Sequence, residues 1–214
     1  IFGGPGMGAQ AVAYQAAFVA EAAALKSNVC VVGLLDLVKA FETVPHYIIE
    51  LGYPLVLLRL CLASYRLRRT IGIEGVFSKH SIATRGITAG SGTAATELEL
   101  LLLPFMKLIG ALWARSLVAK VYVDDLTLIV RGAAAFMVKR LAEILNFVIS
   151  HLEGDLQMQV PKEKSNVISS KPCLALAVAD QVSNGTVKAA SHAKILGTDT
   201  VGGTRRCTLA AILR

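Results

Sequence analysis

The sequence predicts an α+β fold with the element order βαββαβ, a ferredoxin-like arrangement in which helices cover one face of an antiparallel sheet. Three observations lead to this fold class. A short run with β-branched residues ends at Asp36, two apolar runs flank Asp124 and Asp125, and helix-like segments stand between these strands. Hydrophobic residues make up 54% of the 214 residues, so the chain can bury a substantial core.

The first predicted elements are a helix, a strand and a second helix. Residues Ala9–Lys26 are rich in alanine and carry larger apolar residues at roughly helical spacing. Val29–Leu35 is too short for a buried helix, so it predicts a buried strand with the carboxylate of Asp36 at its end. Pro54–Arg66 predicts a helix, because proline is favoured in the first helical turn.

The middle of the chain predicts a small hairpin, a loop and a long helix. Thr70–Ile82 alternates loosely between apolar and polar residues, which is typical of a hairpin. Arg85–Thr93 is glycine-rich and leads into a helix, at whose start Thr96 and Glu99 have the spacing of a capping box. We expect Pro104 to kink this helix.

The last predicted elements are a second hairpin, a helix and a final strand. Leu117–Val123 and Leu126–Val130 are strand-like runs joined by a tight turn at Asp124-Asp125. Ala133–Leu152 carries apolar residues on one face and predicts a helix. Leu156–Val160 alternates apolar and polar residues with the two-residue period of a half-buried strand.

In this order the first strand and the second hairpin are neighbours, which would bring Asp36 close to Asp124 and Asp125. A structural explanation also exists, because Asp is common in turns, where it hydrogen-bonds its own backbone. Three converging carboxylates repel one another unless they are protonated or neutralised by cations. Two Mg²⁺ ions, with Mn²⁺ as the alternative, would neutralise them and stabilise both oxygens of a phosphoryl transfer.

Composition favours an intracellular protein with an anionic partner. Lys and Arg outnumber Asp and Glu by 22 to 15, and the net charge of +7 suits nucleic acid. No stretch reads as a membrane span of ~20 apolar residues. The four cysteines are far apart and form no Cys-x-x-Cys pair, so we expect no zinc site or disulfide framework and a reducing compartment, nuclear or cytoplasmic.

Two motifs resemble those of reverse transcriptases. Tyr122-Val123-Asp124-Asp125 is similar to the Tyr-x-Asp-Asp box of that family, and Leu35–His46 resembles the first carboxylate motif of non-LTR (LINE-like) retrotransposon polymerases. Further matches are Arg85–Ser91, which resembles the loop beneath the template, and Lys194–Gly197, which resembles the motif that grips the primer.

The resemblance implies a polymerase right-hand palm with partial fingers and a missing thumb. Residues 1–28 would be the end of the fingers region, and residues 29–170 the palm, with an inserted helix and hairpin at about residues 53–84. Residues 171–214 would end the palm with a primer-grip-like hairpin.

The resemblance also implies roles for individual residues. Asp36, Asp124 and Asp125 would bind the metal ions, and Lys164 would donate a proton to the leaving pyrophosphate. The residues expected to contact the nucleotide are Leu37, Phe41, Gly86, Gly90 and Tyr122, with Phe41 excluding a 2′-hydroxyl. Those expected to contact nucleic acid are Arg66, Arg68, Arg69, Arg85, Leu196 and Gly197. The structural alternatives are core packing for Phe41, a solvated surface position for Lys164 and a solvated helix end for the arginines.

The function implied is an RNA-directed DNA polymerase that joins a dNTP to the 3′-hydroxyl of a DNA primer on an RNA template. The alternative is a catalytically decayed retroelement remnant that only binds nucleic acid. Two departures favour it: Ala89 stands where the family usually has Gln, and Phe2–Gly8 lacks the basic residues that hold the triphosphate. A nucleotide-binding enzyme with Gly3–Gly8 as its phosphate loop is a third hypothesis, weakened because no strand precedes this loop.

Overall fold

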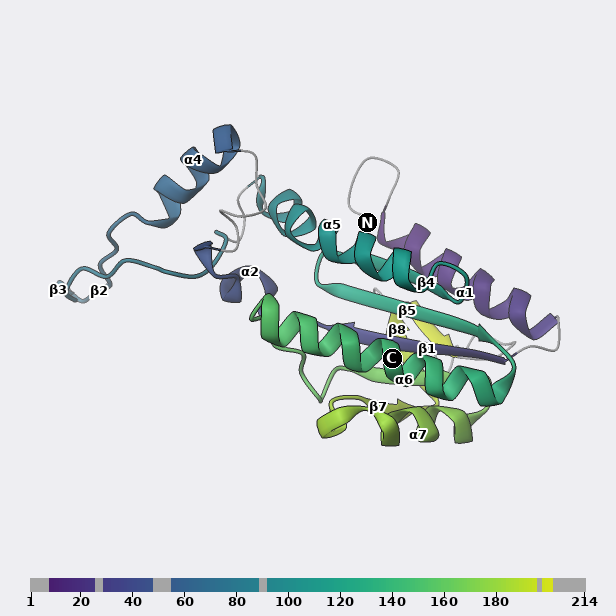
Figure 1. The fold of residues 1–214 in the computed structure, drawn as a ribbon. Coiled ribbons are helices and arrows are strands. Elements are labelled where there is room, and N and C mark those ends of the chain that lie inside the picture. The colour runs from purple at the N-terminus through teal and green to yellow at the C-terminus, as the bar shows by residue number, and fades with distance from the viewer. Residues whose placement is uncertain (1–7, 26–28, 48–54, 89–91, 196–197, 202–214) are drawn as a thin grey trace.

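A computed structural model of the chain describes residues 8–25, 29–47, 55–88, 92–195 and 198–201. Their centre is a five-stranded sheet with the strand order β4-β5-β1-β6-β7, shown in Figure 1. Neighbouring strands are antiparallel except β6 and β7, which are parallel. The strands are β1 (Val29–Asp36), β4 (Leu117–Tyr122), β5 (Asp125–Gly132), β6 (Asn166–Ser169) and β7 (Lys188–Ala190). The predicted α+β fold class is confirmed.

Strand β1 lies in the middle of the sheet and is buried along nearly its whole length. It pairs with β5 on one side, in a register that runs from Val29 opposite Gly132 to Asp36 opposite Asp125. On its other side it pairs with β6. A strand covered on both faces is expected to be a continuous apolar run, as this one is up to Asp36.

Three helices cover one face of the sheet: α5 (Ala94–Leu112), α6 (Ala134–Ser150) and α7 (Pro172–Gln181). Side chains from these helices form one core with alternate residues of β1, such as Val31 and Leu35. Gly33 lies between them, and a Cβ at this position would be 2.9 Å from Cδ2 of Leu145. The missing side chain therefore lets α6 approach β1 closely.

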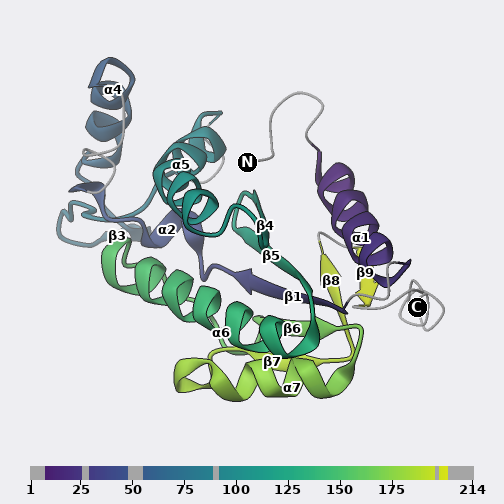
Figure 2. The same cartoon turned by 45° about the vertical axis from the view of Figure 1, so that its right-hand side comes forward.

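Helix α1 (Ala9–Leu25) covers part of the opposite face. Its buried alanines, including Ala16 and Ala20, pack against Val32 and Ile129. The hairpin of β8 (His192–Ile195) and β9 (Thr198–Val201) lies on the same side, as Figure 2 shows. The assignment of α1 to a fingers region and of this hairpin to a primer grip stays a prediction.

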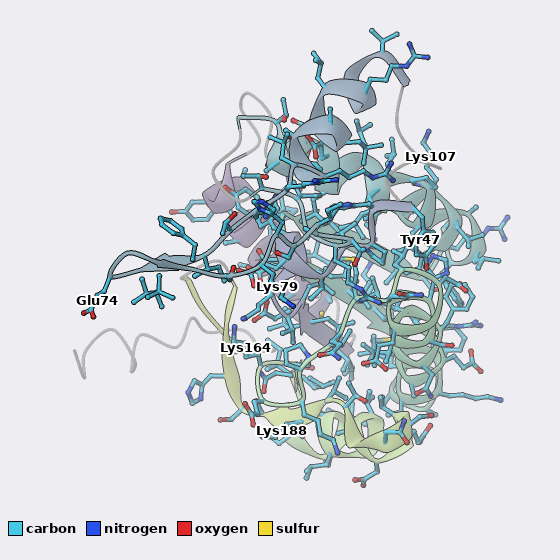
Figure 3. All side chains as sticks on the ribbon, turned by 90° about the vertical axis from the view of Figure 1, so that its left-hand side faces the viewer. Tyr47, Glu74, Lys79, Lys107, Lys164 and Lys188 are labelled. Atoms are coloured by element: carbon cyan, nitrogen blue, oxygen red, sulfur yellow. The ribbon has the colours of Figure 1, made fainter. Side chains whose placement is uncertain are left out.

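An arm of helix α4 (Leu55–Tyr65) and the hairpin of β2 (Gly72–Ile73) and β3 (Val76–Phe77) projects from the sheet in Figure 1. Glu74, labelled at the tip of the hairpin in Figure 3, and Gly75 have φ angles of 50° and 82°. Positive φ at both central residues is what a two-residue hairpin turn of type I′ requires. The predicted helix and hairpin are confirmed. The arm returns to the body near the short helix α2 (Ala40–Thr43).

The start of α5 differs from the prediction. The helix begins at Ala94, with Thr93 as its N-cap residue, so Thr96 and Glu99 lie inside the helix and form no capping box. Instead the Thr93 hydroxyl donates to the carboxylate of Glu97, at 2.8 Å. The helix continues through Pro104, and the kink expected there stays a prediction.

The end of the palm-like segment also differs from the prediction. Leu156, Met158 and Val160 are buried in the expected alternation, but they form no strand. Gln157, with φ of 54°, interrupts the extended backbone. The strand that completes the sheet is β6, at residues 166–169, and the sequence reasoning missed helix α7 after it. Helix α6 ends at Ser150 and continues as one π-helical turn, His151–Asp155.

No helix within the described part of the chain is long and apolar enough to cross a membrane.

Candidate active site

Asp36 and Asp125 are direct cross-strand neighbours at the end of β1 and the start of β5. Side-chain alternation places both on the α1 side of the sheet, because Leu34 and Ile129, two and four residues away, pack there. Opposite residues of an antiparallel pair have Cβ atoms about 4.5–5.5 Å apart, and like charges there are destabilising. The register of the sheet therefore brings Asp36 close to the hairpin carboxylates, as the sequence predicted.

Asp124 lies in the turn between β4 and β5. The connection is Val123-Asp124 rather than the predicted Asp124-Asp125, because Asp125 already pairs with both Tyr122 and Asp36. Val123 has φ of 55°, a left-handed conformation that is unfavourable for a β-branched residue. Such strain is concentrated at functional sites, where the surrounding structure maintains it.

The electrostatics of the site disfavour negative charge. Burial, and after it the neighbouring charges of Asp124 and Asp36, raise the pKa of Asp125 to about 6. Burial also raises the pKa of Asp124, to which the charge of Asp36 adds. A cation bound between these carboxylates would offset both effects.

Lys164 supplies one positive charge to the cluster. Its Nζ lies 2.9 Å from Oδ2 of Asp36, and its side chain is 69% exposed. The hydrogen bond to Asp36 raises the pKa of Lys164, with the charge of Asp36 adding to the effect. Lys164 is labelled in Figure 3, on the side of the molecule that carries the arm. The sequence predicted this residue at the site, and the structure brings it there.

A cavity of about 300 Å³ lies beside the carboxylates. Its lining residues are Leu34, Leu35, Asp36, Asp125, Leu126, Thr127, Lys164 and Asn166. The lining contains two carboxylates and one ammonium group beside the leucines, so a polar, charged ligand suits the cavity better than an apolar one.

The carboxylates suit magnesium by their chemistry. Among the described residues, no three acidic, histidine or cysteine side chains surround one point as a closed metal cage would require. Magnesium, however, is usually bound by one or two carboxylates together with waters and substrate phosphates. The pair Asp36 and Asp125, with Asp124 one residue away, fits that mode of binding.

Gly86 is held against the segment that follows Asp36. Its φ is +98°, and a Cβ there would be 3.2 Å from the carbonyl oxygen of Glu42. Its N–H donates to Val44 O at 2.8 Å, and the next N–H, of Ile87, donates to Phe41 O at 2.6 Å. Only glycine meets both the backbone and the space requirement here.

The other residues expected to contact the nucleotide differ in how deeply they are buried, and one of them is not described. Phe41 is half-buried and packs against the main core, and its contact with the sugar stays a prediction. Leu37 is 4% exposed and its side chain belongs to the core, so its contact with the nucleotide stays a prediction. Tyr122 is half-buried opposite Asp125. Gly90 lies outside the described residues.

Four arginines were expected to contact nucleic acid, and two of them line a second cavity. Arg69 and Arg85 border a space of about 310 Å³ together with Glu42, Gly86, Ile87 and Thr88. Arg85 Nη2 also donates to Gln157 Oε1 at 2.8 Å. Arg66 and Arg68 are exposed beyond the end of α4. Leu196 and Gly197, between β8 and β9, lie outside the described residues.

The sequence reasoning missed a buried polar group beside this second cavity. Tyr65 at the end of α4 and Glu97 in α5 are both 2% exposed and share a hydrogen bond of 2.7 Å. A signal was present, because Glu97 lies one residue before the buried Leu98 and four before Leu101, on the apolar face of its helix.

Comparison with known proteins adds information about the fold alone. No family model and no curated protein matches the sequence. Apo telomerase from Candida tropicalis superposes with a TM-score of 0.64 at 11% identity, over 91% of this chain and 36% of that one. The same telomerase with the TWJ fragment of telomeric RNA gives 0.62 at 11% identity, over 91% and 33%. Candida albicans telomerase with that fragment gives 0.51 at 12%, over 92% and 36%. The chain thus spans about a third of the length of these structures.

Proposed function

Because the chain has a reverse-transcriptase-like fold, we propose that it is the polymerase core of a non-LTR retrotransposon reverse transcriptase. It would transfer a nucleotidyl group from a dNTP to the 3′-hydroxyl of a DNA primer on an RNA template. The observation that carries the proposal is the register of the sheet, which sets Asp36 opposite Asp125 and beside the turn that contains Asp124.

In this proposal the three carboxylates hold two Mg²⁺ ions, or Mn²⁺ in their place. When bound, the ions supply positive charge to the attacking and leaving oxygens of the phosphoryl transfer. The carboxylates orient the primer end and the triphosphate through those sites, and the raised pKa values of Asp124 and Asp125 reflect the charge that a cation would offset. This donor set is the support for the metal, since its oxygens are the ligands that magnesium prefers.

Lys164 is proposed to move the proton of the reaction. Its ammonium group, held by Asp36 at 2.9 Å, is positioned beside the cavity that would receive the triphosphate. It would donate a proton to the leaving pyrophosphate as a general acid. The backbone carbonyl of Phe41 accepts a hydrogen bond from the N–H of Ile87. The Phe41 side chain would exclude a ribose 2′-hydroxyl.

The nucleic acid is proposed to lie across the α1 side of the sheet and the arm. The net charge of +7 and the exposed arginines near the end of α4 favour an anionic partner. The RNA-bound telomerase of similar fold supports an RNA partner. Leu196 and Gly197 would contact the primer, and the chain would act inside the cell, in the nucleus or the cytoplasm.

A second candidate function is nucleic-acid binding without catalysis. Two observations favour it: the Lys164 ammonium group occupies the space beside Asp36, and Ala89 replaces the glutamine that is usual in this loop. This candidate and the polymerase make opposite predictions for nucleotide addition.

Primer extension on an RNA template with Mg²⁺ and dNTPs tests the proposal. The wild type is expected to extend the primer, and Asp124→Asn to lose about 10³-fold or more in rate. Asp180→Asn, an exposed Asp on α7, is the matched control and should extend as the wild type does. Template binding by the wild type without extension would favour the second candidate.

A further inference from the structure

A buried carboxylate connects the arm to the body of the molecule. Glu97 Oε2 accepts a hydrogen bond of 2.7 Å from the Tyr65 hydroxyl, and Oε1 accepts one of 2.8 Å from Thr93. Burial, and after it the Glu97 carboxylate, raise the pKa of the Cys61 thiol in α4. Glu97 and Tyr65 are each 2% exposed, so the contact between α4 and α5 is made inside the protein.

The carboxylate fixes a geometry rather than filling space. A buried charge is unfavourable unless several donors satisfy it, and an apolar side chain of similar volume often serves stability equally well. Here both oxygens are satisfied, by donors from two different segments. Burial and the bond to Glu97 raise the pKa of Tyr65, which keeps its hydroxyl protonated as a donor.

Contacts continue from Tyr65 to the cavity lined by Arg69 and Gly86. The ring of His46 stacks on Tyr65 with centroids 5.8 Å apart, and its Nε2 donates to Gly86 O at 3.0 Å. Arg69 Nη2 donates to the carbonyl oxygen of Tyr65 at 3.3 Å. Tyr65 therefore contacts, directly or through one ring, two of the groups that line this cavity.

We propose that Glu97 is a positioning residue, which acts through Tyr65 on Arg69 and on the Gly86 loop (residues 85–88). In the arrangement that Glu97 maintains, Arg69 and this loop bind one backbone phosphate of the template strand. Arg69 and Arg85 provide the guanidinium groups, which suit phosphate geometry. The one carboxylate in the lining, Glu42, is paired with Lys39 at 3.4 Å, which offsets its charge. The identity of the ligand rests on the proposed function, whereas the positioning does not.

Hydrogen exchange of the Gly86 and Ile87 amides tests the positioning without any ligand. Tyr65→Phe and Glu97→Leu are expected to speed their exchange about tenfold, because each removes a hydrogen bond to a charged group. Amides in α6, such as that of Leu141, should keep their protection. Glu97→Gln, whose amide can bond both hydroxyls, should restore the wild-type rate, and Glu99→Leu on the same helix should not change it. A uniform loss of protection, or none, would overturn the positioning.

Binding of an RNA template annealed to a DNA primer tests the ligand. Tyr65→Phe should weaken the affinity about tenfold and leave its salt dependence unchanged, because every cation is still present. Arg69→Ala should weaken it and also reduce the slope of log affinity against log salt by about 1. An unchanged affinity in Arg69→Ala would overturn the phosphate assignment, and an unchanged affinity in Tyr65→Phe would overturn the claim that Tyr65 holds Arg69 for binding.

The two proposals fail in different ways. If the wild type binds the template but adds no nucleotide, and the variants behave as expected, the proposed polymerase fails while the role of Glu97 stands. If the wild type binds no nucleic acid, the phosphate assignment is overturned together with the proposed function. The exchange rates then still decide whether Glu97 holds the Gly86 loop.

Discussion

Asp36, Asp124 and Asp125 are unfavourable neighbours in the free protein. Asp36 and Asp125 share one cross-strand position, and burial with neighbouring charge raises the pKa of Asp125 to about 6. Lys164 offsets part of the charge, but from an exposed position where screening is strong. Perturbed carboxylates of this kind are characteristic of sites that bind cations or perform acid–base chemistry.

Asp125→Asn is expected to stabilise the metal-free protein at pH 7. The folded-state pKa of Asp125, about 6, exceeds the unfolded value of 3.8, so the folded protein binds more protons between these values. Wild-type stability should therefore fall as pH rises through this window. We expect the variant to be more stable at pH 7 by about 1 kcal/mol, a value reduced for solvent screening.

Urea denaturation at pH 4 and pH 7 measures this effect. Added Mg²⁺ should stabilise the wild type more than Asp125→Asn, because a ligand stabilises only the protein that binds it. Asp180→Asn serves as the control, with no change in pH dependence expected. Loss of stability in Asp125→Asn at pH 7 would show that Asp125 is stabilised by its surroundings instead.

Phe41→Val is expected to weaken discrimination against ribonucleotides. The Phe41 side chain is half-buried beside the carboxylate strand, so a smaller residue leaves room for a 2′-hydroxyl. Relative incorporation of rNTP over dNTP should rise by about tenfold or more, the effect of roughly 1.4 kcal/mol. Phe136→Val, at an exposed position in α6, is the control. If the ratio is unchanged while stability falls, Phe41 is a core residue only.

At the level of elements, the sequence predicted most helices and strands but not all of their boundaries. The apolar run of β1 and the face of α6 were readable because burial sets their periodicity. The turn at Val123-Asp124 was placed one residue late, since the pairing of Asp125 with Asp36 is a tertiary contact. The strand expected at Leu156–Val160 failed because the backbone of Gln157, which alternation cannot reveal, is left-handed.

Gly86→Ala tests the loop that joins the arm to the carboxylate segment. A methyl group there meets the Glu42 carbonyl oxygen at 3.2 Å on a backbone with φ of +98°. We expect a loss of about 1–3 kcal/mol in the free energy of unfolding. Gly110→Ala is the matched control in the last turn of α5, where a Cβ meets nothing within 4 Å. Thermal denaturation of both variants should show opposite shifts, and equal shifts would contradict the account of Gly86.

The whole molecule combines a covered sheet face with a second face that carries the site. Helices α5, α6 and α7 cover one side, while α1 and the β8–β9 hairpin lie on the side toward which Asp36 and Asp125 point. The order of elements along the chain predicted a sheet with helices on one face, but not that α1 and the β8–β9 hairpin lie on the other. The connection of Glu97 to Tyr65 was not predictable, because the two residues are 32 positions apart and meet only through the packing of α4 on α5.

The Mg²⁺ dependence of single-nucleotide addition to a primer on an RNA template tests the central claim most directly. The account predicts that the wild-type rate rises with the second power of Mg²⁺ concentration below saturation, as two ions require. Asp36→Asn and Asp125→Asn should each lower the saturated rate by about 10³-fold or more, while Asp180→Asn keeps it. Wild-type rates in either site variant, or no addition by the wild type at any Mg²⁺ concentration, would contradict it.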